Sequence, residues 1–305
     1  MRYLIIANPV AGKGLCLQLI PSITESLQSH QLDFEIVQTE RPGHAIELAR
    51  QAALDGYDVV VAAGGDGTVN EVINGLALAS EDGQHKACLA VIPVGRGNDF
   101  AFGMGVPHHW QASVDALAAN KRRPIDIGRV VGPNFPDGRY LGNGVGIGFD
   151  TIVGFVAAKL RLRGMLAYLV AAIKTIFLYY RAPLLEIELD DRTVTQPAIM
   201  VSIMNGRRMG GSFMMAPQSL QDDGLFDLCV VGQVSRMAIL GLMPKVMNGT
   251  QYEHPAVKLY RSSKVKVTAL NGSLPAHADG ETVCEEGKMI TMEIEPSRLD
   301  IVVAG

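Results

Sequence analysis

Apolar and polar positions follow different patterns in the two halves of the chain. In the first 125 residues, short apolar runs alternate with stretches whose apolar residues recur every three or four positions. Short runs are typical of buried strands, and the three-to-four spacing is typical of amphipathic helices. The pattern predicts strands at residues 3–7, 34–38, 58–63 and 87–93, and helices at 15–29, 45–54, 69–79 and 111–119. Strands that alternate with helices indicate a parallel sheet covered on both faces.

The pattern in the second half predicts a β-rich domain. Short β-like runs are separated by turn dipeptides such as Asp190-Asp191 and Asn271-Gly272, which favours antiparallel pairing. The predicted strands are residues 127–131, 184–189, 198–204, 227–231, 264–270 and 289–294. A single helical stretch, at about 152–180, interrupts them. We therefore place an α/β domain at residues 1–127 and a β-rich domain at 128–297.

Composition narrows the function classes. The 305 residues are 48% hydrophobic and 19% charged, which is the balance of a globular protein of about two domains. A net charge of −4 argues against general binding to nucleic acid. The four cysteines are far apart and have no metal-ligand spacing, so we expect buried, reduced thiols in a cytoplasmic protein.

Two glycine-rich loops carry the strongest chemical signal. The first, AGGDGTVNEV at residues 63–72, follows a predicted strand and opens a helix, and its glycines would let backbone N–H groups approach a phosphate. Asp66 inside it is either a group that positions metal or water, or a helix cap. The second, PVGRGNDF at residues 93–100, follows the next strand. Loops at the ends of neighbouring parallel strands share the edge where open α/β sheets bind ligands, which favours a nucleotide site.

These loops begin a longer series of motifs that resembles the diacylglycerol kinase catalytic-domain family, in its bacterial soluble lipid kinase branch. The match spans essentially the whole chain in order, and GGDGT alone would not be specific because NAD kinases share it. The further motifs are NP at 8–9, DIG at 126–128, GNG at 142–144, GFD at 148–150, NG at 205–206, AP at 216–217, DDGLFD at 222–227 and DGE at 279–281.

The resemblance implies an ATP-dependent lipid kinase with an α/β nucleotide-binding domain, a C-terminal β-sandwich and an active site in the cleft between them. It implies that residues 298–305 return to the first domain, and that ATP and Mg²⁺ are the cofactors. By resemblance, Asp279 is the general base, with Glu281 and Asp66 as further catalytic carboxylates. The nucleotide-binding residues that it implies are Asn8, Thr39, Gly64, Gly65, Gly67, Thr68, Gly95, Gly97, Asn98 and Asp99.

Physical chemistry is consistent with a role for the DGE motif. If residues 278–283 are extended, Asp279 and Glu281 point to the same face and present two carboxylates to one cleft. Phosphoryl transfer needs a group that orients or deprotonates the attacking hydroxyl. A surface turn with solvated acids is the competing interpretation.

A second acidic segment surrounds Gly224. Asp222, Asp223 and Asp227 offer only oxygen ligands, which suit Mg²⁺. The resemblance implies a structural or regulatory magnesium site here, with the Asp223 side chain and a nearby carbonyl such as that of Leu225. A solvated β-turn would explain the same residues.

The chain departs from the family pattern at Arg96, where a threonine is usual. A hydroxyl there would contact a nucleotide phosphate, whereas an arginine could reach the phosphate with its charged guanidinium or simply cover the loop.

Residues 151–185 contain no acidic side chain and five basic ones. These are Lys159, Arg161, Arg163, Lys174 and Arg181, and they are interleaved with Phe155, Leu160, Leu162, Met165, Leu166, Leu169, Ile173, Ile176, Phe177 and Tyr180. This patch either docks on an anionic membrane surface or forms a core helix pair. No segment has the apolar length of a spanning helix, so we expect a cytoplasmic protein that meets the membrane peripherally during turnover and binds no nucleic acid; a homodimer is left open.

Several functions compete with phosphorylation of diacylglycerol. The acceptor could be phosphatidylglycerol, sphingosine or ceramide, because no sequence motif identifies the lipid that the acceptor pocket binds. The chain could also be an NAD kinase or a non-catalytic nucleotide-binding regulator. The DGE ending argues against an NAD kinase, and the intact carboxylates argue against a regulator.

Overall fold

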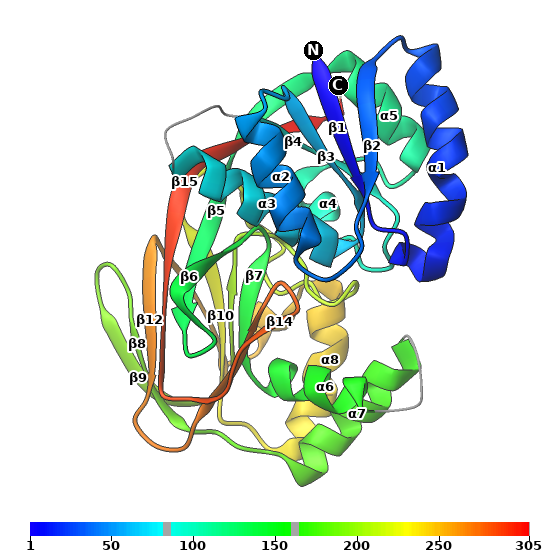
Figure 1. The fold of residues 1–305 in the computed structure, drawn as a ribbon. Helices are drawn as coiled ribbons and strands as arrows, with labels where there is room; N and C mark the ends of the chain where they lie inside the picture. Colours follow the sequence, from blue (N-terminus) through cyan, green and yellow to red (C-terminus); the bar gives the residue numbers. More distant parts are fainter. Residues whose placement is uncertain (82–86, 160–164, 305) are drawn as a thin grey trace.

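The computed structural model describes residues 1–81, 87–159 and 165–304, which form two lobes (Figure 1). The first lobe consists of β1 (Arg2–Ala7), α1 (Ala11–Ser29), β2 (Asp33–Gln38), α2 (His44–Leu54), β3 (Val59–Gly64), α3 (Asp66–Glu81), β4 (Cys88–Pro93), α4 (Asp99–Met104) and α5 (Trp110–Ala119). The remaining elements are β5 (Lys121–Gly132), β6 (Phe135–Leu141), β7 (Gly144–Gly148), α6 (Phe149–Ala158), α7 (Met165–Leu178), β8 (Leu184–Glu188), β9 (Thr193–Met204), β10 (Phe226–Gly232), α8 (Arg236–Asn248), the 3₁₀ turn η1 (Gln251–Glu253), β11 (Val257–Ser262), β12 (Lys264–Ala269), β13 (Leu274–Ala278), β14 (Glu281–Gly287) and β15 (Met289–Val303).

The first lobe has the predicted parallel sheet. Its strands follow the order β4-β3-β1-β2, and all three pairings are parallel. Alternate residues of β1 face opposite sides: Leu4 and Ile6 pack in the cluster with α2 and α3, and Tyr3 and Ile5 pack with α1 and α5. The sheet is therefore buried on both faces, which explains its uninterrupted apolar strands.

The second lobe is a β-sandwich with antiparallel pairing, as predicted, but its helices differ from the prediction. The single helical stretch is two helices, α6 and α7, and residues 160–164 between them lie outside the described residues. A further helix, α8, was not predicted. Gly241 and Pro244 lie inside it and interrupt the helical pattern in the sequence. In Figure 1, α6, α7 and α8 lie together on one side of the sandwich, below the loops of the first lobe.

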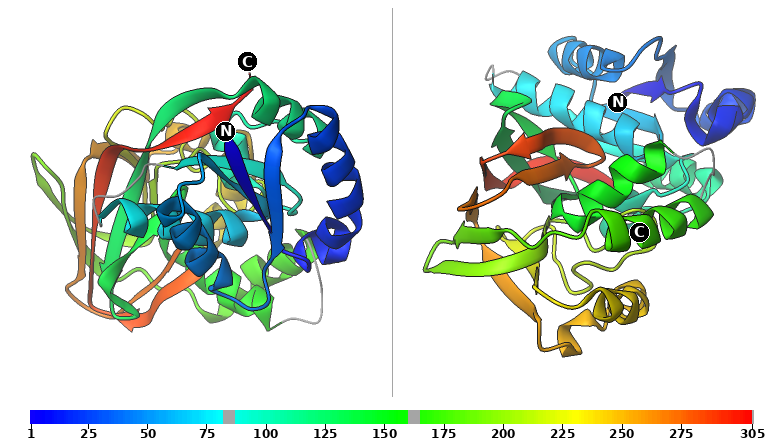
Figure 2. Two further views of the ribbon diagram at one scale, coloured as in Figure 1. Left: turned by 45° about the horizontal axis from the view of Figure 1, so that its top comes forward. Right: turned by 90° about the horizontal axis from the view of Figure 1, so that it is seen from below.

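Two strands join the lobes. β5 and β15 are antiparallel partners over most of their length, and the pairing shifts between Glu295 and Leu299. Ile301 of β15 also pairs in parallel with Leu89 of β4, so the end of the chain returns to the first sheet. The boundary that we placed after residue 127 falls inside β5. The left view in Figure 2 shows β15, in red, running from the sandwich to the first lobe.

Candidate active site

The two glycine-rich loops lie against each other at the carboxyl edge of the parallel sheet. The Val94 N–H donates to the Gly64 carbonyl at 2.8 Å. A Cβ on Gly95 would lie 2.5 Å from the Gly65 Cα. The loops can approach this closely only because neither residue has a side chain.

Other predicted nucleotide-binding residues shape these loops. Asn8 Nδ2 donates to Thr68 Oγ1 at 3.0 Å, and Asn98 Nδ2 donates to the Gly95 carbonyl at 2.9 Å. The Thr39 N–H donates to the Ala7 carbonyl at 2.9 Å and so extends the β1–β2 pairing by one residue. Contact between these residues and a nucleotide stays a prediction.

A cavity of about 1020 Å³ begins beside the loops and continues into the second lobe. Its polar end includes Asp66, Arg96, Gly97 and Asp99 from the first lobe and Asp279 from the second. Most of the remaining wall is apolar, with side chains from α6, α7, α8, the adjoining strands and the segment between β9 and β10. Among these are Phe149, Val153, Phe155, Ala172, Ile199, Met200, Met209, Phe213, Leu242, Met243 and Val246. Three of the predicted carboxylates therefore meet at one end of a largely apolar chamber.

The carboxylates of Asp66 and Asp99 both lie close to Gly97. A Cβ on Gly97 would lie 2.8 Å from Asp66 Oδ2 and 3.7 Å from Asp99 Oδ2. The other oxygen of Asp66 accepts the Phe100 N–H at 3.1 Å, which fixes its carboxylate at the start of α4. Asp66 Oδ2, free among the described residues, is an oxygen ligand of the kind that Mg²⁺ takes together with substrate phosphates.

Asp99 is held by the second lobe. Arg208 Nε donates to Asp99 Oδ1 at 2.8 Å, and the Gly211 N–H donates to both carboxylate oxygens at 2.9 and 3.0 Å. Arg208 also stacks over the Phe102 ring at 4.0 Å. Burial and the nearby Asp66 charge raise the pKa of Asp99 to about 6, although the Gly211 N–H and Arg208 act in the opposite direction.

Asp279 is enclosed by N–H donors. Its oxygens accept the Gly142 and Gly144 N–H groups at 2.8 Å each and the Asn143 N–H at 3.2 Å. Asn70 Nδ2 donates at 3.0 Å. Burial raises the pKa of Asp279, and these hydrogen bonds oppose the rise because they favour the charged form.

The DGE motif is not extended, so the predicted same-face geometry of Asp279 and Glu281 is wrong. Asp279 and Gly280 have φ values of 47° and 89°, and Ala278 pairs with Glu281 across them. They form the two-residue loop of the β13–β14 hairpin. Asp-Gly is a strong sequence signal for such a loop, because both positions need positive φ.

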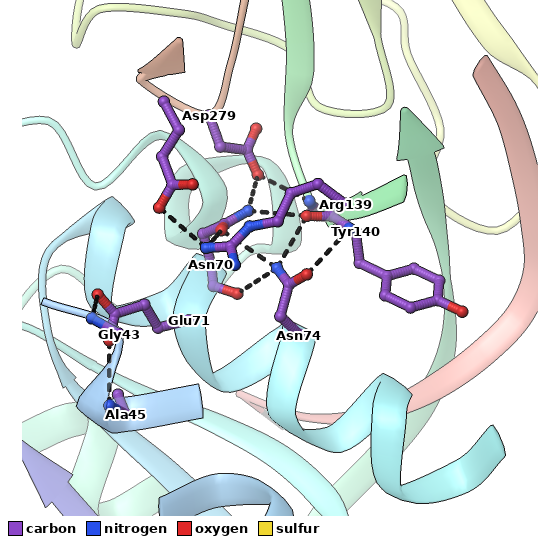
Figure 3. Close-up of polar contacts among 10 residues, drawn as sticks. Gly43, Ala45, Asn70, Glu71, Asn74, Arg139, Tyr140 and Asp279 are labelled. Atoms are coloured by element: carbon purple, nitrogen blue, oxygen red, sulfur yellow. Dashed lines mark hydrogen bonds and ion pairs between the residues drawn. The ribbon is translucent and has the colours of Figure 1, made fainter. Parts of the chain in front are cut away.

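Glu281 is linked to Asp279 through Arg139 and Asn70, and Figure 3 shows the contacts among Arg139, Asn70 and Asp279. Glu281 Oε1 accepts from Arg139 Nη2 at 2.9 Å, and the same nitrogen donates to Asn70 Oδ1 at 3.1 Å. Asn70 in turn donates to Asp279, so it links the two lobes. Glu281 is not among the cavity-lining residues. The neighbouring Glu71 instead caps α2, because it accepts the N–H groups of Gly43 and Ala45.

The acidic turn at residues 222–227 is already neutralised by arginine. Asp223 forms an ion pair with Arg261, whose Nε also lies 3.3 Å from Asp227 Oδ1. The other oxygen of Asp223 accepts the Leu225 N–H at 3.1 Å. A cation would have to displace Arg261, and the described residues contain no group of three or more acidic, histidine or cysteine side chains that could hold a metal. The turn as it stands does not fit a metal ion, and the role of Asp223 and Leu225 as ligands stays a prediction.

The basic and apolar patch is divided between buried and exposed faces of α7. Ile176 is buried, whereas Ile173, Lys174, Phe177 and Leu178 are exposed. Arg181 is exposed just beyond the helix. Residues 160–164 and the side chains of Met165, Leu166 and Leu169 lie outside the described residues. Among the helices that are described, none has the length and apolar character needed to cross a bilayer.

Sequence reasoning missed several residues at the cavity. Asn70 and Asn143 lie inside the GGDGTVNEV and GNG motifs, and their amides have the hydrogen-bonding capacity to hold a carboxylate in place. Arg208 has no local signal, because its partner Asp99 is 109 positions earlier in the chain. Asp150 and His277 also line the cavity.

The comparisons with known proteins agree over most of the chain. Residues 2–130 match the diacylglycerol kinase catalytic domain, and residues 143–303 match the YegS C-terminal NAD kinase beta sandwich-like domain. A diacylglycerol kinase of Bacillus subtilis is 29% identical over 283 residues, covering 92% of this chain and 89% of the relative. One from Staphylococcus aureus is 30% identical, covering 92% and 86%.

Solved structures share the fold. A diacylglycerol kinase from Bacillus anthracis superimposes with a TM-score of 0.73 at 20% identity, covering 99% of this chain and 96% of its own. An NAD kinase from Archaeoglobus fulgidus is more distant, with a TM-score of 0.53 at 16% identity over 100% and 94% of the two chains. The predicted family, its two-part fold and its enzyme class are thus confirmed: the chain belongs to the diacylglycerol kinase catalytic-domain family and is a lipid kinase, which implies that it uses ATP.

Proposed function

We propose that this enzyme transfers the γ-phosphate of Mg²⁺-ATP to the free hydroxyl of diacylglycerol or a closely related lipid. The observation that carries the proposal is the cavity of about 1020 Å³, which has carboxylates at one end and an apolar chamber at the other. A lipid acceptor has the same division, because its reacting hydroxyl is polar and its acyl chains are not. NAD is polar along its length and would leave the apolar wall without a partner.

The nucleotide phosphates would lie at the two glycine-rich loops, near the N-terminus of α3. Asp66 would hold the magnesium ion, with Asp99 beside it kept in place by Arg208 and the Gly211 N–H; the ion would supply electrostatic stabilisation to the transferring phosphoryl group. Arg96 lines the same end of the cavity and would contact a phosphate with its guanidinium.

Asp279 would receive the lipid hydroxyl at the junction between the polar and apolar ends. Its carboxylate is fixed by the N–H groups of Gly142, Asn143 and Gly144, so it can orient a hydroxyl without moving. Because those donors favour its charged form, we assign it chiefly to orientation of the hydroxyl and acceptance of its proton late in transfer. Glu281 would act indirectly, because it holds Arg139 and, through Arg139, Asn70 in place.

The exposed face of α7 would bring the enzyme to the bilayer. Phe177 and Leu178 are 52% and 70% exposed, and Lys174 and Arg181 lie beside them. Apolar side chains next to cations suit an anionic lipid surface. The opposite face of α7 contributes Ala172 to the cavity, so docking would place the chamber next to the membrane.

The acceptor is tested by incubating the protein with Mg²⁺-ATP and dispersed diacylglycerol, phosphatidylglycerol, sphingosine, ceramide and, separately, NAD, with products identified by mass. We expect phosphatidic acid as the main product. Another phosphorylated lipid would change the acceptor but keep the enzyme class. NADP as the sole product, or no product despite ATP binding, would contradict the proposal.

Membrane docking has its own test. Phe177→Ser combined with Leu178→Ser should weaken co-sedimentation with vesicles of phosphatidylglycerol and phosphatidylcholine by about tenfold. Leu259→Ser, at an exposed leucine of β11, is the matched control. Equal vesicle binding by the double variant and the control would contradict the assignment of α7.

A further inference from the structure

A histidine and an aspartate form a second polar pair in the cavity. His277 lies on β13, two residues before Asp279, and Asp150 lies in the first turn of α6. His277 Nε2 and Asp150 Oδ2 are 3.8 Å apart, and their side chains are only 17% and 12% exposed. Both residues line the cavity at which the lipid hydroxyl is proposed to react.

Gly146 of β7 makes room for this pair. A Cβ on Gly146 would collide with Asp150 Oδ2 and lie 2.6 Å from His277 Nε2. Both side chains therefore extend over a strand position that has no side chain of its own. His277 projects away from the sandwich core, since its neighbours Ala276 and Ala278 are the residues of β13 that point into that core.

Two atoms of the pair lack a hydrogen-bond partner among the described residues. Asp150 Oδ1 accepts the Thr151 N–H at 2.8 Å, but Asp150 Oδ2 accepts none. His277 Nδ1 is also buried and without a partner. Neither of these two atoms is exposed to the cavity, whereas His277 Nε2 is not among the buried unpaired atoms, so Nε2 is the atom of the pair that a ligand in the cavity would reach.

The place of the pair indicates which part of a lipid it would meet. Asp279 follows His277 by two residues, and Asn143 directly precedes β7, the strand that pairs with β13. Beyond Asp150, α6 continues with Val153 and Ala157, which line the apolar chamber. A lipid whose hydroxyl is at Asp279 and whose chains are in the chamber would have its ester linkages between the two.

We propose that His277, oriented by Asp150, donates a hydrogen bond to an ester carbonyl of the lipid acceptor and so selects acyl esters over ethers. Asp150 Oδ2, 3.8 Å from Nε2, favours the tautomer that carries its proton on Nε2, and this N–H is offered to the carbonyl oxygen. No bond is made or broken at His277, which binds the part of the lipid that does not react. This inference rests on the proposed function, because it takes the lipid hydroxyl to lie at Asp279.

The test compares two acceptors that differ only in the linkage: 1,2-dioctanoylglycerol and 1,2-dioctylglycerol, the corresponding diether. Wild-type enzyme should favour the diester in kcat/KM by about fivefold, chiefly through KM, which is the size expected of a hydrogen bond between neutral groups. His277→Phe should bring that ratio close to one. His277→Gln, which keeps an N–H donor, should retain part of it, and Asp150→Asn should lower it to an intermediate value.

His108→Phe is the matched control, because His108 is exposed and does not line the cavity, and it should show the wild-type ratio. A ratio that is unchanged in His277→Phe, or a loss that falls equally on both lipids, would overturn the inference and leave the proposed function standing. Failure of the wild-type enzyme to phosphorylate either lipid would overturn both.

Discussion

Asp99 and Asp279 line the same cavity, yet they are held in opposite ways. Asp279 is enclosed mainly by backbone N–H groups of a single short segment, residues 142–144. Asp99 belongs to the first lobe and is held by the Arg208 side chain and the Gly211 N–H of the second. Backbone donors carry no net charge and do not titrate, whereas the contacts of Asp99 depend on the position of the other lobe. The Asp279 site is thus preorganised mainly by one segment of its own lobe, with a further contact from Asn70, and the Asp99 site is completed by the packing of the lobes.

The largest expected effect is at Asp279. Asp279→Ala should lower kcat by roughly 1000-fold, since it removes the group that orients and deprotonates the hydroxyl, while ATP binding stays near the wild-type value. Steady-state kinetics and isothermal titration with ATP check the two parts. Glu281→Gln is the comparison variant and should lose at most about tenfold, because Glu281 acts through Arg139 and Asn70. Equal losses from both variants would contradict the distinction.

Removal of Arg208 should come next in size. Arg208→Met leaves the Asp99 carboxylate buried without its cation, so the free energy of unfolding should fall by about 3 kcal/mol in urea titrations. Asp99→Asn combined with Arg208→Met should recover most of that loss, because no charge is then left unpaired. Arg192→Met, at an exposed ion pair with Asp191, should leave stability nearly unchanged. A double variant no more stable than Arg208→Met would show that Arg208 acts through packing instead.

A smaller effect should appear in the pH dependence of stability. The pKa of Asp99 rises from 3.8 to about 6 in the folded protein, so the folded state holds this proton more tightly than the unfolded state does. Its contribution to the free energy of unfolding is therefore present in full below pH 4 and is lost as the pH rises through 6, by on the order of 1–3 kcal/mol. Unfolding of wild type and Asp99→Asn from pH 4 to 7 should show a difference that declines across this window. A constant difference would contradict the raised pKa.

Much of the first lobe could be predicted because its determinants are local. Apolar runs such as residues 58–63 and the glycine-rich loops predict strands, helices and a phosphate site without knowledge of distant contacts. The hydrogen bonds that hold Asp99 and Asp279 in place could not be predicted in the same way, because they join residues more than 100 positions apart. The hairpin at Asp279-Gly280 is an intermediate case, since the sequence contains its turn signal but an extended strand also fits the surrounding residues.

The apolar chamber has a similar explanation. α8 supplies Leu242, Met243 and Val246 to its wall. The helix was not predicted because Gly241 and Pro244 interrupt its helical pattern in the sequence. The acceptor site was therefore the part of the molecule that sequence reasoning could describe least.

The central claim is that a lipid chain occupies the chamber that ends at Asp279, and a pair of glycine variants tests it most directly. Gly154 of α6 lines the cavity, Gly241 of α8 is exposed and does not, and a Cβ would meet no atom within 4 Å at either. Gly154→Leu should raise the KM for long-chain diacylglycerol by about tenfold, more than for the dioctanoyl lipid, with ATP binding intact. Gly241→Leu should behave as wild type. Equal KM values for both variants, with the wild-type dependence on chain length, would contradict the account.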